Sequence, residues 1–167
     1  MASSDRPKVK LTPSSFDLIA MGVVVVSVLY TGMSLAAGYG ELPDRIPTHF
    51  NATGEPDGYG SPRSRWMLFG VQMSIAIGVW VLSYFPHMHN YMVEITEENA
   101  ERVYSNSVSL LHGVNAICCS YFAYMIVTNL SIAKGELNGL GSLSMVLFMV
   151  TLFGLIGYFI WRIFCVQ

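Results

Sequence analysis

The side chains that could do chemistry in this 167-residue chain gather in one short segment, residues 42–60. It holds His49 and the carboxylates Asp44, Glu55 and Asp57. An imidazole and carboxylates can bind a divalent metal, and His49 with Asp57 is the candidate pair. The same groups could contact a binding partner, or hold the segment together through hydrogen bonds. The residue types leave these three roles open.

Proline and glycine punctuate the same segment. Pro43 and Pro47 fix their own φ and push the preceding residue toward extended geometry. Gly54 and the run 56–58 supply turns. We therefore predict an ordered Pro/Gly-rich loop over residues 40–65 that lies on the membrane surface. The side chains expected to face the helices are Ile46, Phe50 and Tyr59.

Four apolar stretches surround or follow this loop. The predicted helices cover residues 16–38, 66–85, 96–132 and 142–164. About 20 helical residues cross the roughly 30 Å hydrocarbon core of a bilayer. Charged residues make up 12% of the chain, against about 25% in soluble domains. The sequence therefore predicts an all-α integral membrane protein, with residues 1–167 as a single membrane domain of four transmembrane helices.

The first apolar stretch has a second interpretation, as a secretory signal peptide. Arg6, Lys8 and Lys10 would form its charged start, and the run 34–36 resembles a small-residue cleavage site. The stretch is longer than a usual signal core, however, and this length favours a membrane helix.

Basic residues near the helix ends predict the orientation. With four helices both termini share a side, which carries five Lys and Arg residues against four on the other side. Three of the five precede the first helix. We therefore expect a multi-pass protein of the cell inner membrane, with both termini in the cytoplasm and the loop 40–65 outside.

The third predicted helix carries polar residues on one face. His112, Asn115 and Cys119 recur at helical spacing, and Asn129 lies within about 40° of Asn115 around the helix. Such residues either join helices through hydrogen bonds or mark a transport path. We expect no acidic partner for a proton relay, because Asp17 is placed at the mouth of the first helix. A small transporter, or transporter subunit, is thus an alternative function.

Small residues repeat on the second predicted helix, where Gly70, Ser74 and Gly78 share one face. Seams of this kind let two helices approach closely in lipid. The spacing fits a contact within the bundle and also fits a homo-oligomer of two copies.

Composition and motifs exclude other classes. The net charge of -2 provides no basic field for nucleic acid. The three cysteines, Cys118, Cys119 and Cys165, lack disulfide or metal-site spacing. No catalytic triad, zinc-protease helix or phosphate loop is present. We expect a non-enzymatic protein without a cofactor, and a metal-dependent membrane enzyme at His49 and Asp57 is a further alternative.

Nine residues of the loop follow a pattern of Leu-Pro, then Ile-Pro-x-His-Phe, then Gly-x-Pro-Asp. They are Leu42, Pro43, Ile46, Pro47, His49, Phe50, Gly54, Pro56 and Asp57. This pattern resembles the N-terminal domain of unknown function of bacterial SdpI-like membrane proteins. Asn51 and Tyr59 look like the version common in Bacteroidetes members. One departure follows, since Pro62 stands at the family's lysine position and Arg63 comes one place later.

The resemblance implies a function. SdpI-type proteins are immunity proteins that protect a producer from a secreted peptide toxin, and some also signal. They carry a further C-terminal membrane half, which has no counterpart among the four predicted helices. We therefore expect the outer loop to recognise a ligand, such as a secreted peptide or another membrane protein. The expected contact residues are Pro43, Pro47, His49, Phe50, Asn51, Gly54, Pro56, Asp57 and Tyr59.

Overall fold

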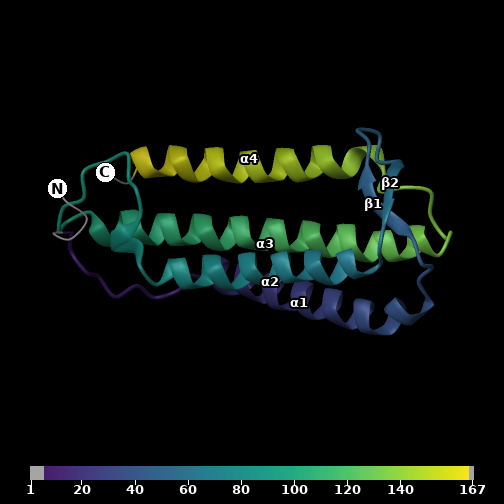
Figure 1. Ribbon diagram of the computed structural model, residues 1–167. Helices are drawn as coiled ribbons and strands as arrows, with labels where there is room; N and C mark the ends of the chain where they lie inside the picture. The colour runs from purple at the N-terminus through teal and green to yellow at the C-terminus, as the bar shows by residue number, and fades with distance from the viewer. Residues whose placement is uncertain (1–5, 166–167) are drawn as a thin grey trace.

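A computed structural model describes residues 6–165 and contains four long helices. They are α1 (Ser15–Gly38), α2 (Arg63–Ser83), α3 (Ala100–Ala133) and α4 (Ser142–Cys165). Figure 1 shows them side by side, with α3 between α4 and the other two helices. Each is long and apolar enough to cross a membrane, which confirms the predicted all-α class with four membrane-spanning helices.

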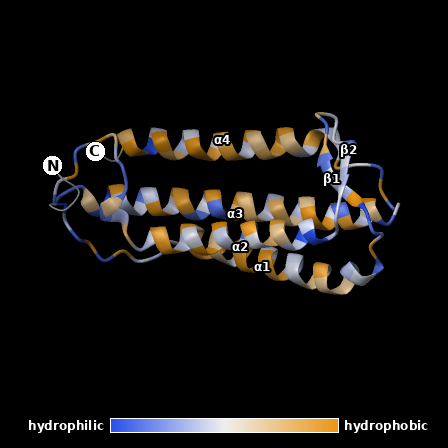
Figure 2. Cartoon of the chain, viewed as in Figure 1, coloured by the Kyte–Doolittle hydropathy of each residue, from blue (hydrophilic) through white to orange (hydrophobic). Residues whose placement is uncertain are grey.

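Apolar side chains cover the outside of the bundle, and polar side chains lie in its centre. Figure 2 shows apolar residues along all four helices. Large side chains such as Leu29, Val150 and Phe153 are exposed, as expected for a surface in contact with lipid. The buried polar residues are Asp17, Ser27, Thr31, Arg65, Gln72, Asn106, Ser109, His112, Asn115 and Asn129. Hydrogen bonds between polar groups therefore contribute to packing of the helices.

The predicted loop 40–65 folds largely as a β-hairpin. A short 3₁₀ helix, η2 (Tyr39–Glu41), leads to β1 (Ile46–Phe50), which pairs antiparallel with β2 (Pro56–Gly60). The prolines indicated extended backbone, but strand pairing depends on contacts that local sequence does not reveal. An isolated two-stranded hairpin is marginally stable in water. The hairpin therefore needs support from the helices.

α3 begins at Ala100, four residues later than predicted from Thr96. The Asn99 backbone N donates to Thr96 Oγ1 (3.3 Å), and the Thr96 backbone N donates to Asn99 Oδ1 (2.9 Å). These bonds between side chains and backbone hold residues 97–99 in a turn. The regular helix consequently starts after the turn.

α2 begins at Arg63 and ends at Ser83, whereas residues 66–85 were predicted. Ser61 opens the first turn early, because its hydroxyl accepts from the Arg63 backbone N (3.3 Å). At the other end Pro86 starts the 3₁₀ helix η3 (Pro86–Met88) and lacks the N–H that a continuing helix needs.

The hairpin and the two chain ends lie at opposite ends of the bundle (Figure 1). Near the chain ends, Arg6 Nη1 donates to the carbonyl of His89 (2.6 Å) and lies against the Tyr91 ring. Burial raises the pKa of Tyr91 to about 12, and its hydroxyl donates to the carbonyl of Pro86 (2.8 Å). The segment before α1 is thus attached to the connection between α2 and α3.

Candidate functional site

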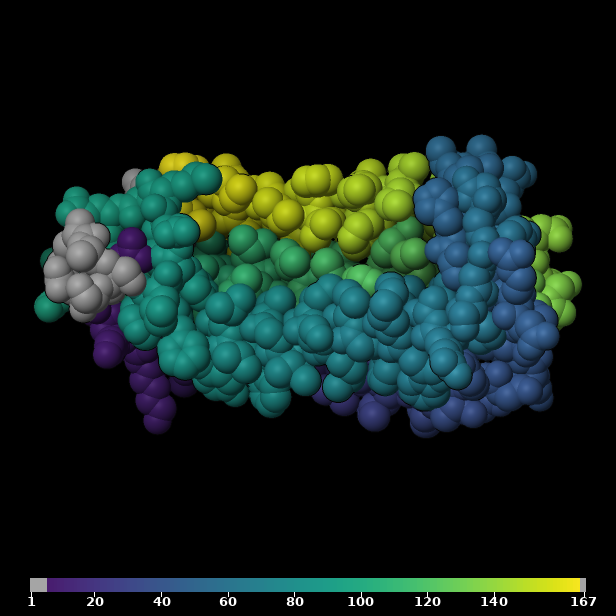
Figure 3. All heavy atoms as spheres, in the orientation of Figure 1, coloured from purple at the N-terminus to yellow at the C-terminus, as the bar shows by residue number. Residues whose placement is uncertain are grey.

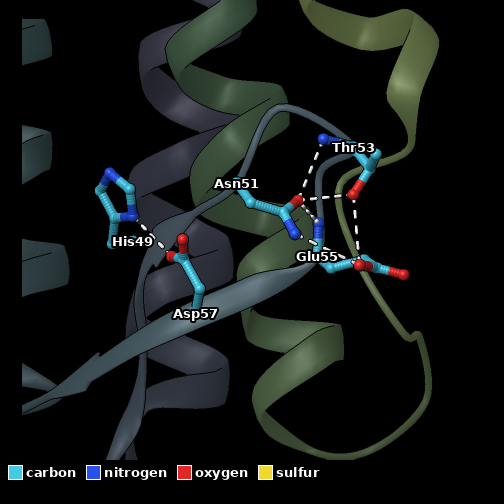
Figure 4. A network of polar contacts seen from close by, with 5 residues as sticks. All are labelled: His49, Asn51, Thr53, Glu55 and Asp57. Atoms are coloured by element: carbon cyan, nitrogen blue, oxygen red, sulfur yellow. Dashed lines mark hydrogen bonds and ion pairs between the residues drawn. The ribbon is translucent and has the colours of Figure 1, made fainter.

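A network of hydrogen bonds shapes the turn between β1 and β2 (Figure 4). Asn51 Oδ1 accepts from the Thr53 backbone N (3.0 Å), Thr53 Oγ1 (2.6 Å) and the Glu55 backbone N (3.0 Å). Gly54 adopts φ +81°, which glycine tolerates without a steric penalty. Asn51 and Gly54, both expected contact residues, therefore also set the shape of the turn.

His49 and Asp57 form a second polar group on the hairpin. His49 Nδ1 lies 2.5 Å from Asp57 Oδ1, and the two side chains are 73% and 43% exposed. Figure 4 shows them facing each other, apart from the turn network. An ion pair this exposed contributes about 0–1 kcal/mol to stability. The pair is therefore available for contacts with a ligand at little cost to the fold.

A metal site needs more ligands than this pair provides. Among residues 6–165, no three His, Cys, Asp or Glu side chains gather in a group that could hold a metal ion. Protein zinc sites use three or four side-chain ligands. His49 and Asp57 supply two.

The carbonyl of Pro47 attaches the hairpin to the bundle. It accepts a hydrogen bond from Arg65 Nη2 (2.9 Å) and a second from Asn129 Nδ2 (3.1 Å). All three residues are buried, and bonds from a charged guanidinium are the stronger kind. Because Arg65 belongs to α2 and Asn129 to α3, this one carbonyl joins the hairpin to two helices.

The tip of the hairpin makes a separate contact with the connection between α3 and α4, residues 134–141. The Leu140 backbone N donates to the carbonyl of Gly54 (2.8 Å). Tyr124 Oη in turn donates to the carbonyl of Leu140. A Cβ built at Gly139 would lie 2.4 Å from the carbonyl oxygen of Gly54. The close approach of the two backbones therefore requires glycine at position 139.

The expected inward-facing residues of the hairpin behave differently from one another. Ile46 is fully buried and Phe50 is partly buried. Tyr59 is 53% exposed, so the prediction that it faces the helices is wrong. Side chains alternate between the two faces of a strand, and in β2 the outward positions are those of Asp57 and Tyr59. The outer face thus carries an aromatic ring beside the His49–Asp57 pair.

A cavity of about 230 Å³ lies between the hairpin and helices α3 and α4. The hairpin side is lined by Thr48, His49, Phe50 and Asn51, and the helix side includes Tyr121, Met125 and Met145. Figure 3 shows the hairpin standing over the end of the helices, with α3 on the floor of a valley between α4 and α2. The lining combines polar groups such as Asn51 and Ser144 with aromatic and thioether groups such as Phe50 and Met145, so the cavity suits an amphipathic ligand.

Among the predicted intramembrane polar residues, Asn115 joins two helices. Asn115 Nδ2 donates to the carbonyl of Ala76 on α2 (3.1 Å), and Cys119 Sγ donates to Asn115 Oδ1 (3.4 Å). Gln72 Nε2 donates to the carbonyl of Cys119 (3.0 Å). Contacts of this kind contribute about 0.6 kcal/mol each on average. The sequence analysis did not single out Gln72, although an amide side chain within an apolar stretch can be recognised from the sequence and indicates a hydrogen bond between helices.

Asp17 lies in the first turn of α1, at the mouth of the helix as predicted, but it is buried and has an imidazole partner. It is 2% exposed, and its Oδ1 lies 3.3 Å from His112 Nδ1. Ser14 and Asp17 form a capping box at the start of α1, with Ser14 backbone N and Oγ both donating to Asp17 Oδ2 (2.7 Å). The packing of α1 against α3 then turns the carboxylate inward. The expectation that His112 has no acidic neighbour is therefore wrong.

The small-residue seam of α2 is exposed along its length. Among the described residues, nothing lies within 4 Å of a Cβ built at Gly70 or Gly78. Ser74 donates to the carbonyl of Gly70 in its own helix (2.8 Å). The seam thus serves no contact within residues 6–165, and a homo-oligomer through this face stays a prediction.

Residues 25–73 match a domain of unknown function. This family, DUF1648, covers the second part of α1, the hairpin and the first part of α2. The match therefore includes Pro47, His49, Asp57 and Arg65, but not Asn129.

The chain is also similar to an uncharacterized protein of Archaeoglobus fulgidus, with 35% identity over 66 residues. The match covers 40% of this chain and 34% of the length of the archaeal protein. No solved structure matches the chain significantly. The family match supports a shared domain around the hairpin, while membership of the SdpI-like family and a Bacteroidetes origin stay predictions.

Proposed function

We propose that this multi-pass membrane protein recognises a ligand, such as a secreted peptide, through the outer face of its hairpin. The observation that carries the proposal is that the groups that attach the hairpin to the bundle differ from the groups that it exposes. Its attachment to the helices uses the backbone carbonyls of Pro47 and Gly54. The side chains of His49, Asp57 and Tyr59 stay exposed. A platform ordered before binding loses little conformational entropy when a ligand arrives.

The groups on this face favour an amphipathic peptide. The His49–Asp57 pair offers a hydrogen-bond donor and an acceptor, and Tyr59 offers aromatic area. The adjoining cavity presents Phe50 and Met145 to an apolar side chain. The resemblance to SdpI-like proteins supports immunity or signalling as the purpose of this recognition.

Recognition of a secreted peptide requires the hairpin to face outward. We infer an inner-membrane location with both termini in the cytoplasm, from the three basic residues that precede α1. Single-cysteine labelling tests this orientation, because Glu55 and Glu98 are both exposed and lie at opposite ends of the bundle.

In a background with Cys118, Cys119 and Cys165 all replaced by Ser, a membrane-impermeant thiol reagent is expected to label Glu55→Cys in intact cells and to leave Glu98→Cys unlabelled. Permeabilised cells should give labelling of both variants, which controls for reagent access. Labelling of Glu98→Cys alone in intact cells would reverse the orientation and place the hairpin in the cytoplasm.

Expression in a host sensitive to the peptide toxin that SdpI-type proteins neutralise tests recognition. The wild-type chain is expected to protect, and His49→Ala and Asp57→Ala to reduce peptide binding by the purified protein at least tenfold, because each removes one partner of the exposed pair. A tenfold loss corresponds to about 1.4 kcal/mol. Glu98→Ala, at the other end of the bundle, is the matched control.

Survival and the dissociation constant in lipid nanodiscs are the two measurements. If the wild type neither binds the peptide nor protects the host, the proposal of toxin recognition is rejected. If His49→Ala and Asp57→Ala protect as well as Glu98→Ala, recognition does not use the exposed pair.

A further inference from the structure

We infer that Asp17 and His112 form a proton-binding site inside the membrane bundle. The site is near the chain ends, whereas the hairpin is at the opposite end (Figure 1). No hairpin residue among those described contributes to it. The inference therefore stands independently of ligand recognition by the hairpin.

The first observation is the burial of both side chains without other partners at the facing atoms. The Asp17 and His112 side chains are 3% and 6% exposed, and Oδ1 lies 3.3 Å from Nδ1. Apart from each other, these two atoms have no hydrogen-bond partner among residues 6–165, and His112 Nε2 has none there either. The separation leaves no room for a water molecule between them. A proton held between the two atoms gives each of them a hydrogen-bond partner.

The second reason for proton binding is the net charge of the buried pair. An ionised Asp17 beside a neutral His112 leaves one net negative charge in a region of low dielectric, and a buried ion costs several kcal/mol. A proton on the imidazole makes the pair neutral overall. The Ser14 hydrogen bonds hold Asp17 Oδ2, so Oδ1 is the oxygen that faces the proton.

The surrounding groups do not supply another counter-charge at the pair. A cavity of about 360 Å³ adjoins it, lined by residues 9–13 of the N-terminal segment, by Tyr84 after α2 and by Ser105 on α3. Lys10 and Tyr84 are the other titratable side chains that line this cavity, and both are exposed. α4 contributes no residue to the lining. His112 is therefore the cation placed against Asp17 Oδ1.

Protons can reach the pair from one direction. The cavity lined by residues 9–13 lies toward the chain ends. On the other side of His112 is a cavity of about 230 Å³ that is mainly apolar, with walls including Val24, Val28 and Ile77, although Asn115 also lines it. The polar lining of the first cavity makes it the side from which a proton reaches the pair.

Nuclear magnetic resonance of the full chain in lipid nanodiscs, labelled with ¹⁵N-histidine, tests the proposal. The ¹⁵N shifts separate an imidazolium from a neutral ring, and the His112→Gln spectrum assigns the His112 signals. We expect the His112 ring of the wild type to take up a proton within pH 5–9. In Asp17→Asn its proton affinity should fall at least tenfold, because the facing negative charge is lost. Asp44→Asn, an exposed carboxylate on the hairpin side, should leave the His112 titration unchanged.

Two results would overturn the proposal: a neutral His112 ring throughout pH 5–9 in the wild type, or the same titration in wild type and Asp17→Asn. The wild-type titration decides the matter even if Asp17→Asn does not fold.

Discussion

Gly139→Ala is expected to destabilise the protein by about 2 kcal/mol, the middle of the range for overpacking. A Cβ at this position would lie 2.4 Å from the carbonyl oxygen of Gly54. Because the opposing atom belongs to the backbone, it cannot rotate away as a side chain would. The clash should separate the hairpin tip from the connection between α3 and α4, and should break the hydrogen bond from Leu140 to Gly54.

Thermal unfolding in detergent micelles measures this effect, and a loss of about 2 kcal/mol corresponds to a melting temperature lower by roughly 4–8 °C. Gly40→Ala is the matched control, because a Cβ there meets nothing within 4 Å among the described residues. Equal melting temperatures for the two variants would show that the tip contact does not hold the hairpin in place.

Replacing Arg65 and Asn129 together is expected to cost more than the sum of the two single replacements. Each donates to the buried carbonyl of Pro47, so either one alone still satisfies that oxygen. The double variant Arg65→Met with Asn129→Leu leaves it without a donor. An unsatisfied buried polar group costs about 1–3 kcal/mol, and this excess is the expected coupling energy.

A double-mutant cycle of unfolding free energies isolates this term. The cycle is needed because Arg65→Met also removes a buried charge, which by itself can stabilise a protein. A control cycle with Arg65→Met and Asn115→Leu should show additive effects, since Asn115 bonds to Ala76 instead. Additivity in the first cycle would mean that Pro47 does not link the two helices.

Both predictions bear on the proposed recognition surface. The contacts at Pro47 and Gly54 are the means by which the helices hold the hairpin. Variants that break them should therefore weaken ligand binding without altering His49, Asp57 or Tyr59.

Local sequence was sufficient to predict the four membrane helices. An apolar stretch of about 20 residues predicts a membrane helix wherever it occurs in a chain, and the bounds of α1 and α4 lie within one residue of those predicted. The turn at Gly54 was also predicted, because glycine at positive φ is a local requirement. The turn predicted over residues 56–58 is wrong, since these residues pair with β1 as part of strand β2. The starts of α2 and α3 were missed by three and four residues, since hydrogen bonds from backbone N–H groups to the hydroxyls of Ser61 and Thr96 decide them.

Tertiary structure alone decided which polar groups meet. Arg65 and Asn129 converge on a carbonyl that lies 18 and 82 residues away along the chain, and no periodic pattern relates such positions. Asp17 has a partner because α1 packs against α3, and Tyr59 is exposed because of its place in the paired strand. Hydropathy and helical spacing describe one element at a time, whereas the contacts of a polar side chain depend on the element that packs against it.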